Sequence, residues 1–331
     1  MLYYYALLYY NINLKQIKTM KKIPLITTLI GLLAFSTLAK ADLKVVTSIK
    51  PIHSLASYIM DGVGSPGLIV DGYNSPHSFQ LKPSHAKMLE QADIIFWIGE
   101  DLENFLEKPL AKIAKKAEKI ELLEIKGIKK LKFRERNIFE EHEEHDDHGH
   151  DAKKEEHDDH DDHGHGEYDP HIWLDPINAK VILNEITEHL IENDSKNAAT
   201  YKSNLAKAIS EIDKLIIDVI TETNTDLSYV VFHDAYQYYE NRFNVNILGA
   251  MTVNPDVMPG AEQIHEIHEV IEHDNVSCIL SEPQFNPDII KSIAKDTSVK
   301  TGVLDPLGAN LKPGKDLYFD LIRNMSASFN C

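Results

Sequence analysis

The side chains best suited to chemistry gather between Glu140 and Glu167, where eight histidines and fourteen carboxylates occupy twenty-eight positions. Imidazole suits zinc, copper and nickel, and carboxylates raise the local concentration of cations. The stretch contains no apolar side chain larger than Ala152, so it cannot bury enough surface to offset the entropy lost on ordering. We therefore predict a mobile, solvated loop that captures divalent metal. An acidic spacer that only solvates the protein is the alternative interpretation.

Three other histidines occur where a strand pattern ends or just before a turn: His77 in YNSPHSFQLKPS, His171 in YDPHIWLDP and His233 in VVFHDAY. In open α/β sheets, ligands bind beyond the carboxyl ends of the strands, so side chains from distant segments can meet there. We expect these three histidines to form the primary metal site. The remaining histidines outside the loop are expected on helix surfaces or in structural roles: His53, His85, His189, His265, His268 and His273.

Short apolar runs alternate with helical patterns on both sides of the loop. LKVVTS, GLIVD, DIIFWIG and KIELLEI precede it, and YVVFHD, VNIL, SCILSE and KTGVLD follow it. Strands that alternate with helices indicate parallel sheets with both faces covered. Between the two sets, apolar residues recur every three to four positions and predict one helix from about Asn197 to Glu222, which would span roughly 40 Å. The predicted fold class is α/β, with two lobes that each contain a mostly parallel sheet flanked by helices, joined by one long helix.

The domain boundaries follow from these patterns. We predict an upstream segment with a signal peptide over 1–41, an N-terminal α/β lobe over 42–190 that carries the loop 140–167, a linking helix over 191–224 and a C-terminal α/β lobe over 225–331.

The first 41 residues contain a pattern typical of secretion. Met20 to Lys22 gives a basic start, Ile23 to Leu38 an apolar run, and Ala39-Lys40-Ala41 a small-x-small cleavage pattern before Asp42. The run is shorter than the roughly 20 residues that a spanning helix needs. We therefore expect a cleaved signal and a periplasmic protein without membrane insertion, and translation that starts at either Met1 or Met20.

Charge and cysteine content restrict the partners further. From residue 42 onward the chain has 52 acidic against 29 basic residues, a formal charge of −23, which argues against nucleic acid and anionic membranes as partners. Two cysteines occur, Cys278 and Cys331. In an oxidising compartment they most simply form a disulfide, which should stabilise the fold by roughly 4 kcal/mol. A thiolate metal site is the rival interpretation.

Several motifs in order resemble one known family. They are SIKPIHSLA, PHSFQLKPS, ADIIFWIGEDLENFLEKP, the histidine-rich insertion, DPHIWLDP, VVFHDAYQYYE, VNPDVMPG, SEPQF and VLDPLGANL. The chain resembles the zinc-specific periplasmic substrate-binding proteins of ABC uptake systems, the ZnuA type, over nearly all of Leu43 to Cys331. This resemblance implies two α/β lobes, a long helix between them, and zinc bound in the inter-lobe cleft.

The resemblance also implies a ligand set. The histidine ligands of the family match His77, His171 and His233. Relatives often carry Glu before the first of these, whereas this chain has Pro76, so the fourth position is predicted to be water, Asp305 or a residue from the loop. Three imidazoles and one oxygen suit tetrahedral zinc and disfavour calcium, magnesium or manganese.

Carboxylates that orient the rings are also expected. We expect Asp234 and Asp175, which follow His233 and His171 in sequence, to play this part.

Three classes of function are consistent with such a site. We predict a monomeric protein, not an enzyme, that captures zinc and passes it to an inner-membrane ABC permease. Metal storage by the loop is the alternative. A zinc hydrolase is the third class, but the chain lacks HExxH and G-x-S-x-G. Glu282 in SEPQF is its best candidate base, and a structural or docking role suits that residue better.

Overall fold

The computed structural model describes residues 42–134, 166–252, 255, 259–295, 297 and 299–331. The predicted signal peptide lies outside the described residues, and so does the histidine-rich loop apart from Gly166 and Glu167. Leu43–Cys331 packs as one unit.

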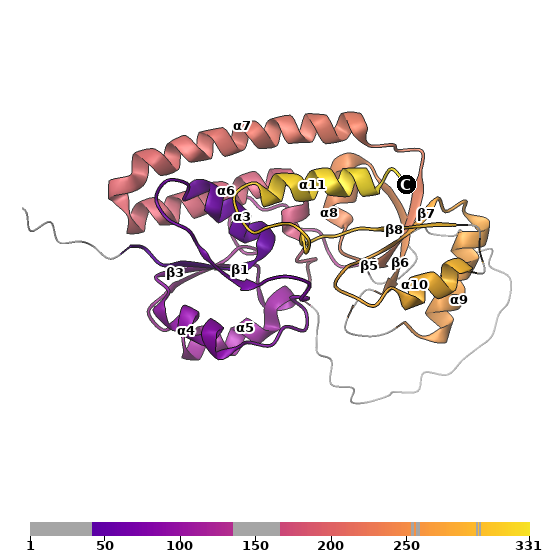
Figure 1. Cartoon of the computed structure of the whole chain (residues 1–331), viewed down its shortest axis with the longest axis horizontal. Helices are drawn as coiled ribbons and strands as arrows, with labels where there is room; N and C mark the ends of the chain where they lie inside the picture. Colours follow the sequence, from indigo (N-terminus) through magenta and orange to yellow (C-terminus); the bar gives the residue numbers. More distant parts are fainter. Residues whose placement is uncertain (1–41, 135–165, 253–254, 256–258, 296, 298) are drawn as a thin grey trace, which may run out of the picture. The chain divides into compact units, whose positions relative to one another are not determined.

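The first half contains a four-stranded parallel sheet. Its strands are β1 (Val45–Ile49), β2 (Gly67–Val70), β3 (Ile94–Trp97) and β4 (Glu118–Glu121), in the order β2-β1-β3-β4. The helices that connect them are α3 (Lys50–Ile59), α4 (Pro83–Gln91) and α5 (Glu100–Lys112). Figure 1 shows α4 and α5 on one face of this sheet and α3 on the other. Both faces are therefore covered, as continuous apolar strands require.

The second half repeats this arrangement. Its strands are β5 (Ser228–His233), β6 (Asn246–Thr252), β7 (Cys278–Ser281) and β8 (Lys300–Val303), again all parallel, in the order β6-β5-β7-β8. Its helices are α8 (Gln237–Phe243), α9 (Ala261–His273), α10 (Asp288–Lys295) and α11 (Leu317–Ser328). Apolar side chains of α9 and α10 form a separate core against one face of the sheet. The predicted α/β class with two parallel sheets is confirmed.

Two long helices lie in sequence between the sheets. They are α6 (Pro176–Asn193) and α7 (Ala198–Glu222), and short 3-10 turns precede them at Ile172–Leu174 and Ser195–Asn197. The predicted long helix is confirmed to within one residue. It packs on α3 and α6 near one end and on α11 near the other (Figure 1).

The long helix α7 is held by one buried face. Tyr201, Ile212 and Leu215 are fully buried there, and each buried aliphatic side chain stabilises the fold by about 1.5–3 kcal/mol. Asn204 adds a polar anchor, because its Nδ2 donates to the carbonyl oxygens of Ile59 and Asp61 where α3 ends. Those carbonyls have no partner within α3 itself, so α7 and α3 are fixed to each other.

Local sequence signals explain where helices begin. Proline occupies the first turn of α3, α4 and α6, where its missing N–H costs nothing. Asp175 caps α6 by accepting from the N–H of Ile177 at 2.8 Å, and it also binds Arg242 through both carboxylate oxygens at 2.7 and 2.8 Å. This capping aspartate therefore ties α6 to α8.

A disulfide joins Cys278 on β7 to the C-terminal Cys331, with Cα atoms 6.5 Å apart. The predicted pairing is confirmed. Just before it, the ring of Phe329 packs against Tyr229 and Tyr239. The C-terminus is therefore fixed to the second sheet by both a covalent bond and aromatic packing.

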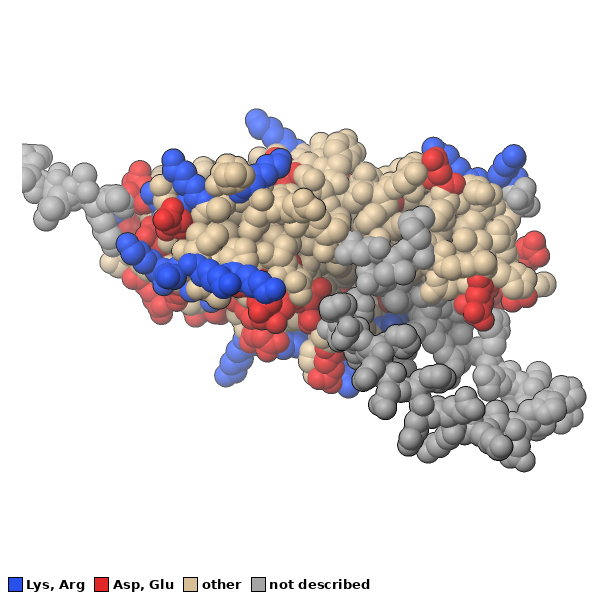
Figure 2. Space-filling view, turned by 90° about the horizontal axis from the view of Figure 1, so that it is seen from below, with Lys and Arg blue, Asp and Glu red and all other residues tan. Residues whose placement is uncertain are grey.

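The surface carries both signs of charge. On the face shown in Figure 2, acidic and basic side chains lie close to one another, and wide areas carry neither. Among the described residues, no helix combines the length and apolarity needed to cross a membrane.

Candidate metal centre

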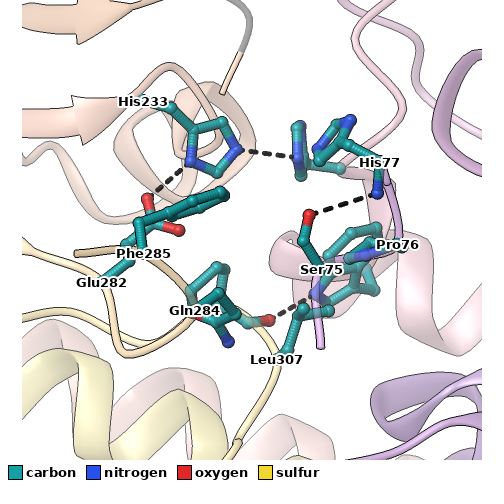
Figure 3. Close-up of a pocket in the computed structure, with 11 residues that line it drawn as sticks. Ser75, Pro76, His77, His233, Glu282, Gln284, Phe285 and Leu307 are labelled. Atoms are coloured by element: carbon teal, nitrogen blue, oxygen red, sulfur yellow. Dashed lines mark hydrogen bonds and ion pairs between the residues drawn. The ribbon is translucent and has the colours of Figure 1, made fainter. Parts of the chain in front are cut away.

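Three histidines from distant parts of the chain meet at one point. His77 lies in the segment between β2 and α4, His171 immediately precedes the turn Ile172–Leu174, and His233 is the last residue of β5. One nitrogen from each lies within 4.8 Å of the others, and the Nε2 atoms of His171 and His233 are 3.4 Å apart. Figure 3 shows His77 and His233 at the wall of a pocket, which His171 also lines.

The backbone around each histidine explains this convergence. The backbone of His233 still pairs with Thr252 of β6, so its side chain leaves the sheet at the carboxyl end of a central strand. The N–H of His171 donates to Asp169 Oδ1 at 2.9 Å, which forms a tight turn, and the N–H of His77 donates to Ser75 Oγ at 3.2 Å. Each ring is thus positioned by a short local constraint.

Two buried carboxylates orient two of the rings. Glu282 Oε1 lies 2.6 Å from His233 Nδ1, and Asp169 Oδ1 lies 2.6 Å from His171 Nδ1. An ionised carboxylate can only accept, so each Nδ1 donates, and the Nε2 of each neutral ring then offers its lone pair to a cation. Tetrahedral zinc with bonds of about 2.0–2.1 Å places its nitrogens about 3.3–3.4 Å apart, which matches the Nε2 separation.

These two carboxylates are not Asp234 and Asp175, the ones expected from the sequence. Asp175 caps α6, and Asp234 binds Arg134 at 3.0 Å. Asp169 precedes His171 by two residues, and this turn-forming spacing could have identified it. Glu282 follows β7, which is next to β5 in the sheet, and only the strand order brings it to His233.

Burial sets the charge states at the site. It lowers the pKa of His171 well below its usual value, and the positive charge of a protonated His233 acts in the same direction. Burial also acts to lower the pKa of His233, but Glu282 outweighs it and the net pKa is raised. Burial raises the pKa of Asp169 to about 7, so this carboxyl gains from any cation placed beside its histidine.

A further buried ion cluster lies behind the histidines. Arg134 binds both Asp234 and Glu240, at 3.0 and 2.7 Å. Burial raises the pKa of each of these two carboxyls to about 7, against the opposing effect of Arg134. Two acids share one guanidinium there, which makes the surroundings of His171 and His233 favourable to added positive charge.

Asp305, the predicted fourth ligand, is engaged elsewhere. Its Oδ1 accepts from the N–H groups of Leu307 and Gly308 and from Gln284 Nε2, and its Oδ2 accepts from the N–H of Ala309 at 2.6 Å. The carboxylate therefore stabilises the turn that follows β8. The structure does not bring it into the group formed by the three histidines.

Three of the other histidines have the structural surroundings expected of them. His265 is exposed on α9 and lies 3.6 Å from Glu269. His85 accepts from the N–H of Lys82 at the start of α4, and His53 lies 3.2 Å from the carbonyl oxygen of Pro66.

Apolar side chains complete the pocket wall around the histidines. They are Pro76, Trp173, Phe285, Pro306 and Leu307. The indole of Trp173 donates to the Pro306 carbonyl at 2.8 Å, which links the two halves of the wall. A small pocket lined by imidazole nitrogens and apolar side chains suits a borderline transition-metal ion better than an organic substrate.

Comparison with known proteins agrees with this fold and chemistry. Residues 45–330 match the family model described as ZnuA, zinc-uptake complex component A, periplasmic. The high-affinity zinc uptake system protein ZnuA of Brucella abortus is 45% identical over 309 residues, which cover 88% of this chain and 92% of that protein. The chain therefore belongs to the ZnuA family of periplasmic substrate-binding proteins, which serve transport systems and are not enzymes.

Solved structures show the same fold at lower identity. A crystal structure of ZnuA superimposes with a TM-score of 0.68 at 21% identity and covers 87% of this chain and 100% of that one. The laminin-binding adhesin of Streptococcus agalactiae, in a mutant form, gives 0.69 at 23% identity, with 87% and 98% covered.

Proposed function

We propose that this protein captures zinc in the periplasm through His77, His171 and His233 and delivers it to an ABC permease. The observation that carries the proposal is the convergence of three imidazoles, two of which have a carboxylate at 2.6 Å on the opposite nitrogen. Relatives named as zinc uptake proteins support the choice of metal.

The site would select zinc by its donor atoms. Three nitrogens disfavour calcium and magnesium, which take oxygen shells. Copper would bind the same donors at least as tightly, so geometry and metal availability must contribute to selection. Because Asp305 is bound to backbone amides, we infer that water or a loop residue supplies the fourth ligand.

Capture would place a dication between Asp169 and Glu282. Each carboxylate stabilises the ring that it orients, and the added charge lowers the cost of keeping the carboxylates ionised in a buried site. The pocket is lined from both halves, by Ser75 to His77 on one side and by Glu282 to Phe285 on the other. We therefore infer two lobes, 42–190 and 225–331, with zinc between them.

The test is zinc titration of alanine variants. Replacing His77, His171 or His233 should weaken zinc binding by orders of magnitude, because each removes one of three protein ligands. His265→Ala, on the exposed surface of α9, is the matched control and should bind normally. Unchanged tight binding in His233→Ala would rule out this assignment.

Delivery needs a separate test, because capture and transport can fail independently. Zinc uptake should be measured in vesicles that contain the cognate permease, with the zinc-loaded protein added outside. Uptake should require the protein and should be lost with His233→Ala. Equal uptake from free zinc at the same concentration would contradict a delivery role.

A further inference from the structure

A second group of metal-capable side chains lies on the first sheet, away from the three histidines. Glu118 is the first residue of the edge strand β4, and His189 and Glu192 lie three positions apart on α6. Residues at this spacing lie on the same helix face. Ligand atoms of the three lie within 4.8 Å of one another. We propose that Glu118, His189 and Glu192 bind a second divalent transition-metal ion.

The imidazole of His189 is already oriented for coordination. Its Nε2 lies 3.1 Å from Glu185 Oε1, one helical turn earlier. If Nε2 carries the proton and donates to that carboxylate, Nδ1 keeps its lone pair. The carboxylate and the free nitrogen have the same relationship as at His171 and His233, with the two ring nitrogens exchanged.

The free nitrogen has no hydrogen bond of its own. His189 Nδ1 is buried and forms none with the described residues, although Glu118 Oε1 is only 2.8 Å away. The pair is close enough for a hydrogen bond but wrongly directed for one. Two ligand atoms of one ion with bonds of about 2.1 Å lie about 3.0–3.4 Å apart. A cation shared by His189 Nδ1 and Glu118 Oε1 would therefore explain their closeness if the two atoms moved apart slightly.

The charge and exposure of the group also suit a cation. Glu118, Glu185 and Glu192 surround one imidazole, and among the described residues no lysine or arginine forms an ion pair with them. Asn193 Nδ2 donates to Glu118 Oε2 at 2.9 Å and fixes that carboxylate. The side chains of Glu118 and His189 are 40% and 20% exposed, so an ion and its remaining waters can enter from solvent.

One imidazole and two carboxylates form a mixed nitrogen and oxygen set. This set accepts zinc and, more readily than a three-histidine site, manganese or cobalt. With fewer nitrogens and partial solvation, it should bind zinc more weakly than the primary site. It lies at the amino end of β4, whereas His77 follows the carboxyl end of β2, so the two sites should load independently.

A rival interpretation is a protonated His189 held between two glutamates without metal. Histidine-selective ¹⁵N NMR on the full chain separates the two. After one equivalent of zinc has filled the primary site, further zinc should move the Nδ1 resonance of His189 as metal binds it. Exposed His265 is the internal reference. The His189 resonance should move at a zinc concentration at least about tenfold lower than the one that moves the His265 resonance. A His189 signal that moves only together with His265 would overturn the proposal.

Crystals of the full chain provide the structural test. Grown with excess zinc, they should show an anomalous peak bonded to His189 Nδ1, Glu118 and Glu192, in addition to the primary peak. Glu192→Gln keeps the shape of the side chain and should remove only the second peak. An occupied primary site with no peak beside His189, or a second peak that survives Glu192→Gln unchanged, would contradict the assignment.

Discussion

Glu282→Gln tests how the protein prepares its histidines for zinc. The carboxylate is 3% exposed and lies 2.6 Å from His233 Nδ1. Glutamine has the same shape and can still accept through its amide oxygen, but it carries no charge. The substitution therefore removes the charge assistance from one orienting hydrogen bond and leaves all three imidazoles in place.

The expected loss can be worked out from this contact. Removing an orienting partner costs about 10–100-fold in metal affinity, which is about 1.4–2.7 kcal/mol. The loss should be largest at alkaline pH. Glu282 raises the pKa of His233, so in the parent protein zinc must displace a proton from His233 at acid pH. In Glu282→Gln the zinc bond to His233 is weaker, but the proton also competes less for that ring. The zinc affinities of the variant and the parent should therefore approach each other as pH falls.

The assay is competitive zinc titration against a chelator between pH 8 and pH 5.5. Glu266→Gln, an exposed position on α9, is the control for removal of one negative charge and should match the parent. Thermal unfolding without metal confirms that each variant is folded. An affinity for Glu282→Gln equal to the parent at pH 8, or a difference that widens toward acid, would refute the reasoning.

Three further predictions concern the loop, the ligands and the fold. Deleting Glu140 to Glu167 should leave one tight zinc site and remove weaker equivalents in calorimetry, and loss of the tight site would favour storage by the loop. In the same deletion variant, zinc affinity should fall by about tenfold per pH unit below the raised pKa of His233, because one proton competes there. A flat profile would show that imidazoles do not dominate the site. Cys331→Ser should reduce the free energy of unfolding by roughly 4 kcal/mol in urea denaturation, because it opens a loop of 53 residues, and an unchanged midpoint would contradict that.

Much of the architecture could be predicted because it depends on local order. Alternating apolar runs and helical patterns predicted all eight strands that the structure describes, and the spacing of Tyr201, Ile212 and Leu215 predicted α7. The disulfide was predictable because two cysteines allow only one intramolecular pairing. The strand order was not predictable from these patterns, because it is decided by contacts between segments far apart in the chain.

The metal site was likewise predictable only in part. His77, His171 and His233 could be selected because each lies where a strand pattern ends or just before a turn, and that position depends on the local sequence. At His233, proximity in sequence was a poor guide to the carboxylate that orients the ring. Asp234 is adjacent to His233, yet its carboxylate binds Arg134.

The sequence by itself determined the α/β class, the long helix and the residue types that could bind zinc, since periodicity and composition act over a few residues. Asp169 lies two residues before His171 and was within reach of the local sequence, but only the tertiary structure decided which carboxylate orients His233. The pairing of β5 with β7 places Glu282 beside His233. Folding of the turn after β8 commits Asp305 to backbone amides, and the packing of α6 near β4 brings His189 to Glu118. These contacts join residues tens of positions apart or compete for one side chain, so they are fixed only when the sheets and helices pack.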